Sequence, residues 1–178
     1  MLNNMKKNNS YLSLFGKVTL QVLLLWIFWI LLFDIQRITF TVHNFSKFND
    51  LGFFTWLGVF FYSLRLDLSA AGFLSILPAI FLIINTVWKK KWAWITFSII
   101  LMFEAIVCSL IHAGEINAYP EWNHKLTGRV FMHLSNPDEV VRTADWGMMF
   151  WFVIYATIEI FLAFKLKKWF FYKKDGTF

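Results

Sequence analysis

Four long apolar runs alternate with shorter polar segments along the chain. The runs cover residues 15–33, 68–88, 92–112 and 146–164, and each is close to the ~20 helical residues that cross a hydrocarbon core about 30 Å thick. Within lipid every backbone N–H and C=O group needs an internal partner, which isolated strands do not provide. The pattern therefore predicts an all-α fold, an integral membrane helical bundle with four spans in a single transmembrane domain over residues 1–178.

A fifth, shorter apolar run covers residues 51–64, and the distribution of Lys and Arg decides how to place it. Cytoplasmic segments of membrane proteins are enriched in these residues. If the run does not cross the membrane, eleven of the 17 basic residues lie on the same side as the amino terminus; if it crosses, only seven do. The count favours four spans with residues 51–64 as a short half-helix in the outer leaflet, and it places both termini in the cytoplasm.

The composition agrees with this class of protein. Apolar residues make up 58% of the chain and aromatic residues 21%, which is too apolar for a surface exposed to water. The formal net charge is +6, and basic residues on the predicted cytoplasmic side favour anionic lipid surfaces. The expected partners are therefore membrane lipids, including anionic phospholipid, and not nucleic acid. The one cysteine, Cys108, lies inside the third predicted span and excludes an intrachain disulfide.

Charged residues interrupt the apolar pattern at the motif SLRLDLSA, which contains Arg65 and Asp67. Residues two apart point to different faces of a helix, so each should find a separate partner. A charge at membrane depth costs about 2.5 to 3.5 kcal/mol on insertion scales and needs a counter-charge or a lipid headgroup. Asp34 and Arg37, just past the first span, and Glu104 in the third span are the candidate partners.

The motif allows two interpretations. In the first, Arg65 extends to phosphate headgroups while Asp67 and Ser69 cap the helix that follows. In the second, Arg65 holds the phosphate of a lipid-linked donor. We expect Arg65, Asp67 and Glu104 to be candidates for lipid headgroup binding, because intramembrane charges are functional by default. The other intramembrane acid, Glu159, is interpreted as a protonated glutamate that is hydrogen-bonded to a neighbouring helix.

The longest polar segment, residues 113–145, is predicted to be an external loop. Helix connections usually span roughly 2 to 8 residues, and long ordered loops tend to be functional. The segment YPEW places Tyr119, Glu121 and Trp122 close together, and Lys125 follows. These side chains either anchor the loop at the level of the headgroups or bind a sugar or glycerol headgroup.

No motif for catalysis or metal binding is found in the sequence. It contains no P-loop, no GxSxG and no dinucleotide fingerprint. The loop region holds several His and acidic residues, but their spacing matches no zinc pattern such as HExxH. These residues are His112, Glu115, His124, His133 and Asp138. We therefore expect no catalytic residue, metal or cofactor in this chain.

The order of these features resembles a known family. The residues that carry the resemblance are the LRLDLS core with Pro78 downstream, and Tyr119, Glu121, Trp122, Lys125, Asn136 and Pro137. Together they are similar to the amino-terminal membrane region of the lipoteichoic acid synthase-like phosphoglycerol transferases. These are sulfatase-like proteins of the alkaline phosphatase superfamily, here in the form found in Bacteroidetes. The similarity covers almost the whole chain.

The resemblance implies a multi-pass protein of the bacterial cytoplasmic membrane and a lipid donor of phosphoglycerol, phosphoethanolamine or a related group. In the family, several membrane helices, commonly five, precede a large extracytoplasmic domain with a threonine nucleophile and a divalent metal, usually manganese. The chain ends in KLKKWFFYKKDGTF on the predicted cytoplasmic side. We therefore expect the last family helix and the catalytic domain to be missing, and no catalytic residue of the family is carried over.

Two functions follow as hypotheses. The first is a membrane-anchoring domain or truncated form of such a transferase or sulfatase-like protein, which contributes to the binding of lipid headgroups. The alternative is a small membrane protein that scaffolds or regulates a partner and has no catalysis. The size of the native protein separates the two hypotheses: a protein several times larger than 21.2 kDa favours the first, and one of that mass favours the alternative.

Overall fold

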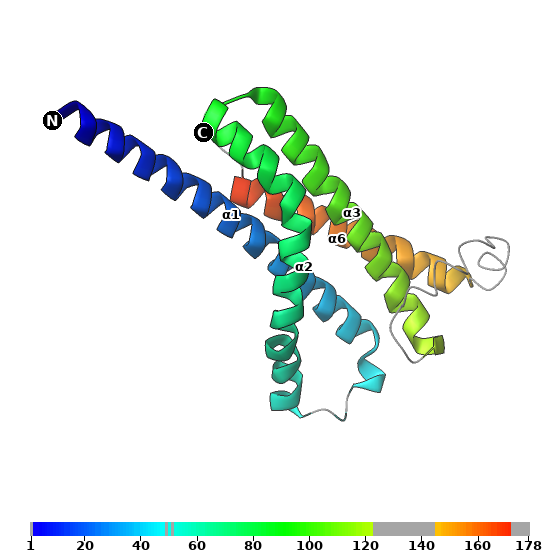
Figure 1. Cartoon of the computed structure of the whole chain (residues 1–178). Helices are drawn as coiled ribbons and strands as arrows, with labels where there is room; N and C mark the ends of the chain where they lie inside the picture. The colour runs from blue at the N-terminus through cyan, green and yellow to red at the C-terminus, as the bar shows by residue number, and fades with distance from the viewer. Residues whose placement is uncertain (1, 49, 51, 123–144, 172–178) are drawn as a thin grey trace.

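The described part of the chain consists of long helices (Figure 1). In this computed structural model the described residues are 2–48, 50, 52–122 and 145–171. The four α-helices are α1 Leu2–His43, α2 Phe53–Trp88, α3 Lys91–Trp122 and α6 Trp146–Phe171. A short 3-10 helix, η1, covers Phe45–Lys47 directly after α1. The described residues contain no strand, and the predicted all-α fold is confirmed.

Each of the four α-helices is long and apolar enough to cross a membrane. Large apolar side chains stay exposed along all of them, as shown by Phe15, Phe61, Phe103 and Val153. A helix that is hydrophobic on every side is typical of a membrane span, because lipid chains then cover the outward faces. The chain is therefore a multi-pass helical membrane protein, as the apolar runs predict.

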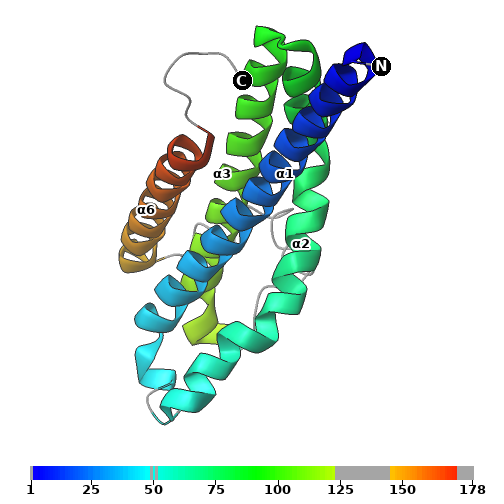
Figure 2. The same cartoon turned by 90° about the vertical axis from the view of Figure 1, so that its left-hand side faces the viewer.

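The helices pack side by side, and consecutive ones run in opposite directions (Figures 1 and 2). α1 contacts α2 and α6, and α3 also contacts both α2 and α6. Near one end of the bundle, Gln21 of α1 is hydrogen-bonded to Thr86 of α2. At the same end, Phe97 of α3 and Phe171 of α6 have ring centroids 5.2 Å apart. The four helices thus enclose a common core.

The two ends of the bundle differ in charge. One end contains the short link between α2 and α3 and the last turns of α6. It carries Lys89, Lys90, Lys91, Lys165, Lys167 and Lys168, and we call it the basic end. The opposite end, at which α1 ends and α2 begins, is called the His43 end.

The core pairs large side chains of α1 with small residues of the other helices. Phe28 and Trp29 of α1 are fully buried, with ring centroids 5.3 Å apart. Ala71 of α2, Ala105 of α3 and Ala163 of α6 are fully buried in the same cluster. Small residues let helix backbones approach closely, which stabilises packing in lipid, where no hydrophobic force drives helices together.

The structure differs from the prediction at the short apolar run 51–64. Residues 53–64 form no separate half-helix but are the first turns of α2, which continues without a break to Trp88; Leu51 lies outside the described residues. No proline separates this run from the next, and a continuous helix satisfies its backbone groups internally in lipid. At 36 residues, α2 is about 54 Å long, well beyond the ~30 Å of a hydrocarbon core.

The predicted external loop, residues 113–145, also begins later than expected. Residues 113–122 are helical and lengthen α3 to Trp122. Ala113 and Ile116 occur three residues apart and are fully buried near Phe40 of α1, so one face of this extension packs against a neighbour. Residues 123–144 lie outside the described part of the chain.

Candidate functional site

Polar side chains gather on α1 near the His43 end, where this helix contacts both α2 and α6. In a helix, residues three or four apart share one face. Gln36, Thr39 and His43 follow this spacing and contact side chains of α6. Arg37, with Asp34 three residues before it, contacts α2 instead. One helix therefore positions two separate groups of interhelical polar contacts.

The first group, called the Glu159 cluster, consists of Gln36, Thr39, His112 and Glu159. The side chain of Glu159 on α6 is fully buried. Gln36 Nε2 on α1 donates a hydrogen bond of 3.1 Å to Oε2 of Glu159. His112 Nδ1 on α3 lies 2.7 Å from Oε1, and Thr39 Oγ1 lies 3.3 Å from the same oxygen. A single carboxyl group thus connects α1, α3 and α6.

The contact between His112 and Glu159 restricts where a proton can lie. An ionised carboxylate only accepts hydrogen bonds, so Nδ1 of His112 must then carry the hydrogen. A protonated Glu159 would instead donate to a bare Nδ1 of His112. His112 and Glu159 therefore form an acid–base pair inside the bundle. The hydrogen bond expected between Glu159 and a neighbouring helix is confirmed.

The second group, called the Arg37 triad, consists of Asp34, Arg37 and Asp67. Arg37 Nη1 donates to Oδ1 of Asp34 at 2.8 Å, and Nη2 lies 2.8 Å from Oδ2 and 3.0 Å from Oδ1 of Asp67. The guanidinium carbon also lies 5.4 Å from the ring centroid of Phe60, within cation–π range. Because two carboxyl groups already pair with the guanidinium of Arg37, its positive charge is balanced without an external anion.

A third contact extends the polar face of α1 to its last residue. His43 Nδ1 lies 3.0 Å from the phenol oxygen of Tyr155 on α6. The His43 ring also meets Trp151 edge to face, with centroids 5.6 Å apart. The end of α1 is thereby held against the first part of α6.

The two charges of the SLRLDLSA motif have separate surroundings, as their spacing predicts. Asp67 is buried and pairs with Arg37, one of the partners proposed from the sequence. The interpretation in which Asp67 and Ser69 cap a helix is wrong, because both residues lie in the middle of α2. Arg65 is exposed on α2 and makes no ion pair with Asp67. Of the two charges, only Arg65 can reach groups outside the bundle.

Glu104 lies apart from both polar groups. It is eight residues before His112 on α3, which corresponds to about 12 Å along the helix. Its Oε2 is buried and has no hydrogen-bond partner among the described residues. Cys108, one turn further along the same face, is a free thiol. A carboxyl oxygen without a partner at membrane depth is unfavourable, and because this oxygen is buried, a group outside the bundle does not reach it in this arrangement.

Replacing Glu104 with leucine should stabilise the bundle by about 1–3 kcal/mol, since a buried polar group without a partner is removed. Unfolding in mixed micelles with sodium dodecyl sulfate, followed by circular dichroism, measures this change. The matched control is Glu104→Gln, which keeps a polar group of the same size and should gain less. A loss of stability in Glu104→Leu would show that the carboxyl group has a stabilising partner.

Tyr119 packs between the ends of two helices. Its ring centroid lies 4.8 Å from that of Phe40 and 6.0 Å from that of Phe48. Lys47 Nζ lies 5.5 Å above the Tyr119 ring and donates a hydrogen bond of 3.0 Å to the carbonyl oxygen of Pro120. Tyr119 therefore joins the end of α3 to η1, and this contact does not test its predicted role in headgroup binding.

The other loop candidates cannot be placed in a site. Glu121 and Trp122 are the last residues of α3, but their side chains lie outside the described part of the chain, as does Lys125. His124, His133 and Asp138 lie there as well. Within residues 2–48, 50, 52–122 and 145–171, no three His, Cys, Asp or Glu side chains are grouped so that they could hold a metal ion.

Sequence reasoning missed three members of the Glu159 cluster. Gln36 and Thr39 lie three residues apart just after the first predicted span, and this spacing was the available signal. His112 was considered only as a possible metal ligand, and its spacing gave no sign of a partner on another helix. The contact of all three with Glu159 depends on how α1, α3 and α6 are rotated about their axes relative to one another, and the sequence pattern of a single helix does not predict this.

The described geometry sets the chemistry that the His43 end can support. Its buried groups are rich in carboxyl oxygens, and its one buried guanidinium is already paired. Such groups suit hydroxyl or ammonium donors, while the exposed Arg65 suits a phosphate. No protein-family model matches the chain, and neither a curated protein nor a solved structure matches it.

Proposed function

We propose that this chain is the membrane domain of a lipoteichoic acid synthase-like phosphoglycerol or phosphoethanolamine transferase, or of a related sulfatase-like protein. In this role it anchors the protein in the bacterial cytoplasmic membrane and contributes to the binding of a lipid headgroup. The proposal is supported by the resemblance carried by LRLDLS and by the residues from Tyr119 to Pro137. The four membrane-spanning helices are consistent with such a domain.

The proposed orientation places the basic end in the cytoplasm, because Lys and Arg are enriched in cytoplasmic segments. The His43 end then lies toward the extracytoplasmic side, where the family carries out its chemistry. The Glu159 cluster and the Arg37 triad fix α1, α2, α3 and α6 relative to one another on that side. A rigid set of helices is the support that a headgroup site needs.

One observation carries the role of Arg65. Of the two arginines near the His43 end, Arg37 is held by two carboxyl groups, whereas Arg65 is exposed on α2. A guanidinium exposed at the level of the headgroups forms charge-assisted hydrogen bonds with phosphate oxygens. We infer that Arg65 binds the phosphate of the lipid donor.

The chain's own residues provide no metal chemistry in this proposal. The resemblance implies manganese in the family's catalytic domain, but the described residues offer no group of ligands that fits a metal ion. The proposed contribution of this chain is therefore to bind and orient a lipid, and no catalytic step is assigned to it.

Replacing Arg65 with alanine should lower the transfer of phosphoglycerol several-fold, because a charge-assisted contact to the donor phosphate is lost. In the native bacterium, the release of diacylglycerol from radiolabelled phosphatidylglycerol measures this transfer. The variant is compared at equal membrane levels with Arg65→Lys, which keeps the charge and should retain most of the transfer. Unchanged release in Arg65→Ala would contradict the role of Arg65.

Deleting the gene separates the two candidate functions. If release of diacylglycerol stays normal after deletion, the transferase proposal fails and the scaffolding role is favoured. Purification from native membranes in mild detergent with no associated protein would count against scaffolding.

A further inference from the structure

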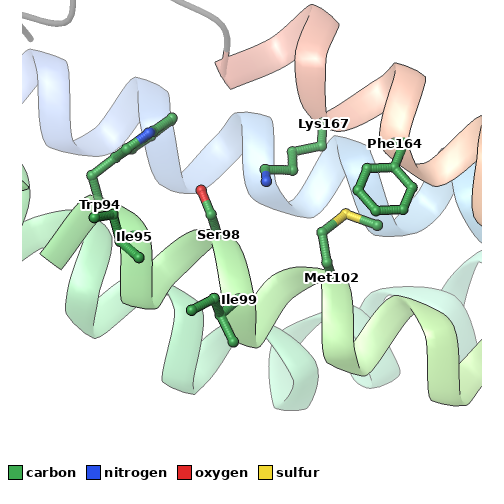
Figure 3. Close-up of a pocket in the computed structure, with 7 residues that line it drawn as sticks. All are labelled: Trp94, Ile95, Ser98, Ile99, Met102, Phe164 and Lys167. Carbon is green, nitrogen blue, oxygen red and sulfur yellow. The ribbon is translucent and has the colours of Figure 1, made fainter. Parts of the chain in front are cut away.

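A groove lies between α3 and α6 near the basic end, away from the proposed headgroup site. Its volume is about 320 Å³. Figure 3 shows its walls, with Ile95, Ile99 and Met102 on α3 and Phe164 on α6. Ile95, Ile99 and Phe164 are each about half exposed, so the groove opens to the surroundings of the bundle. In a membrane protein those surroundings are lipid chains.

Lys167 gives this apolar groove a positive charge. Its side chain extends from α6 into the groove, and its ammonium group points toward Ser98 of α3 (Figure 3). Lys167 is only partly exposed. Among the described residues, no carboxyl group lies within ion-pair distance of it. A partly buried ammonium group without a counter-charge is unfavourable, and an external anion would relieve this.

The lysines of the basic end favour a negatively charged ligand, and the apolar walls of the groove favour one with an acyl chain. Lysines precede the groove at the start of α3 and flank Lys167 on α6, so the local field attracts anions. The apolar walls exclude a small hydrated anion as the best match, since they would stay uncovered. A molecule that combines a phosphate with an acyl chain satisfies both parts, and the hydroxyl group of Ser98 offers a further donor to the phosphate.

We propose that this groove binds one anionic phospholipid, with its phosphate on Lys167 and an acyl chain along Ile95, Ile99 and Phe164. This site differs from the one proposed around Arg65, because it lies at the opposite end of the bundle and requires no transferase activity. It depends only on the membrane fold, and the bound lipid would contact both α3 and α6.

The test is native mass spectrometry of the full chain purified in mild detergent and titrated with phosphatidylglycerol or phosphatidylcholine. We expect the chain to retain one phosphatidylglycerol more tightly than any phosphatidylcholine. Lys167→Ala should weaken this binding about tenfold, the effect of one lost charge-assisted contact. The matched control is Lys165→Ala, because Lys165 is exposed and lies 5.2 Å above the Phe161 ring on its own helix.

A second variant tests the groove itself while leaving the charge in place. Ser98→Trp should fill the space beside Lys167 and lower retention of phosphatidylglycerol even though the ammonium group remains. Circular dichroism and gel filtration establish that each variant is folded. The proposal is overturned if Lys165→Ala weakens binding as much as Lys167→Ala, or if phosphatidylcholine binds equally well.

Discussion

Replacing Glu159 with alanine is expected to destabilise the bundle by about 3 kcal/mol, because buried donors on two other helices lose their acceptor. Gln36 and His112 both direct nitrogen atoms at this carboxyl group, and neither has another acceptor in the described contacts. Thr39 is affected less, since its hydroxyl group also lies 2.9 Å from the carbonyl oxygen of Gln36. Lipid offers no water to replace the lost partner.

Two controls make this result specific. Ile158→Ala changes the neighbouring residue, which is 43% exposed, and should alter stability much less. Glu159→Gln keeps one acceptor oxygen but presents an amide nitrogen to one of the two donors, so its stability should lie between those of Glu159→Ala and the unaltered chain. Unfolding by sodium dodecyl sulfate in mixed micelles orders the variants. Equal stability of Glu159→Ala and Ile158→Ala would disprove the central role of this side chain.

The second large effect is expected at Asp67. Replacing it with alanine leaves the guanidinium of Arg37 with Asp34 as its one remaining carboxyl partner in the triad. Breaking a buried ion pair costs about 3–5 kcal/mol, and the side chains of Arg37 and Asp67 remain 16% and 10% exposed. Solvent or headgroups at this depth screen part of the interaction, so we expect a loss of about 2–3 kcal/mol.

Asp34 supplies the matched control for Asp67. Its side chain is 34% exposed and pairs with the same arginine from within α1, so Asp34→Ala should cost less than about 1 kcal/mol. The double variant Arg37→Met with Asp67→Leu removes both charges together and should recover most of the stability lost in Asp67→Ala. If Asp34→Ala proves the more harmful single change, the contact between α1 and α2 is not what stabilises this region.

Much of the fold could be predicted from the sequence because a membrane span is a local property. A run of about 20 apolar residues predicts one membrane-spanning helix, independently of the rest of the chain. The run before Arg65 was more difficult, since the count of Lys and Arg argued against a fifth span and left this run as a separate half-helix. In the structure, Arg37 pairs with Asp67 from the side, so α2 passes through this point without interruption.

The candidate site could be predicted only in part. Spacing separated Arg65 from Asp67, which is an argument about the faces of a single helix, and the position of Arg37 just past the first span put it among the possible partners. The choice of Arg37 for Asp67 and the meeting of His112 with Glu159 depend on how whole helices rotate against each other. Those rotations follow from the packing of residues such as Trp29, Ala71 and Ala163, which lie on different helices and far from one another in the sequence.

The Glu159 cluster has a consequence for the order in which the protein assembles during synthesis. Asp67 follows Arg37 by 30 residues, so α1 and α2 can pair early, whereas Glu159 follows Gln36 by 123 residues. At a ribosomal speed of about 5–20 residues per second, that interval lasts roughly 6 to 25 s. During this interval Gln36 on α1 lacks Glu159, its hydrogen-bond partner in the folded bundle. The four helices of the bundle come together only when α6 has been made.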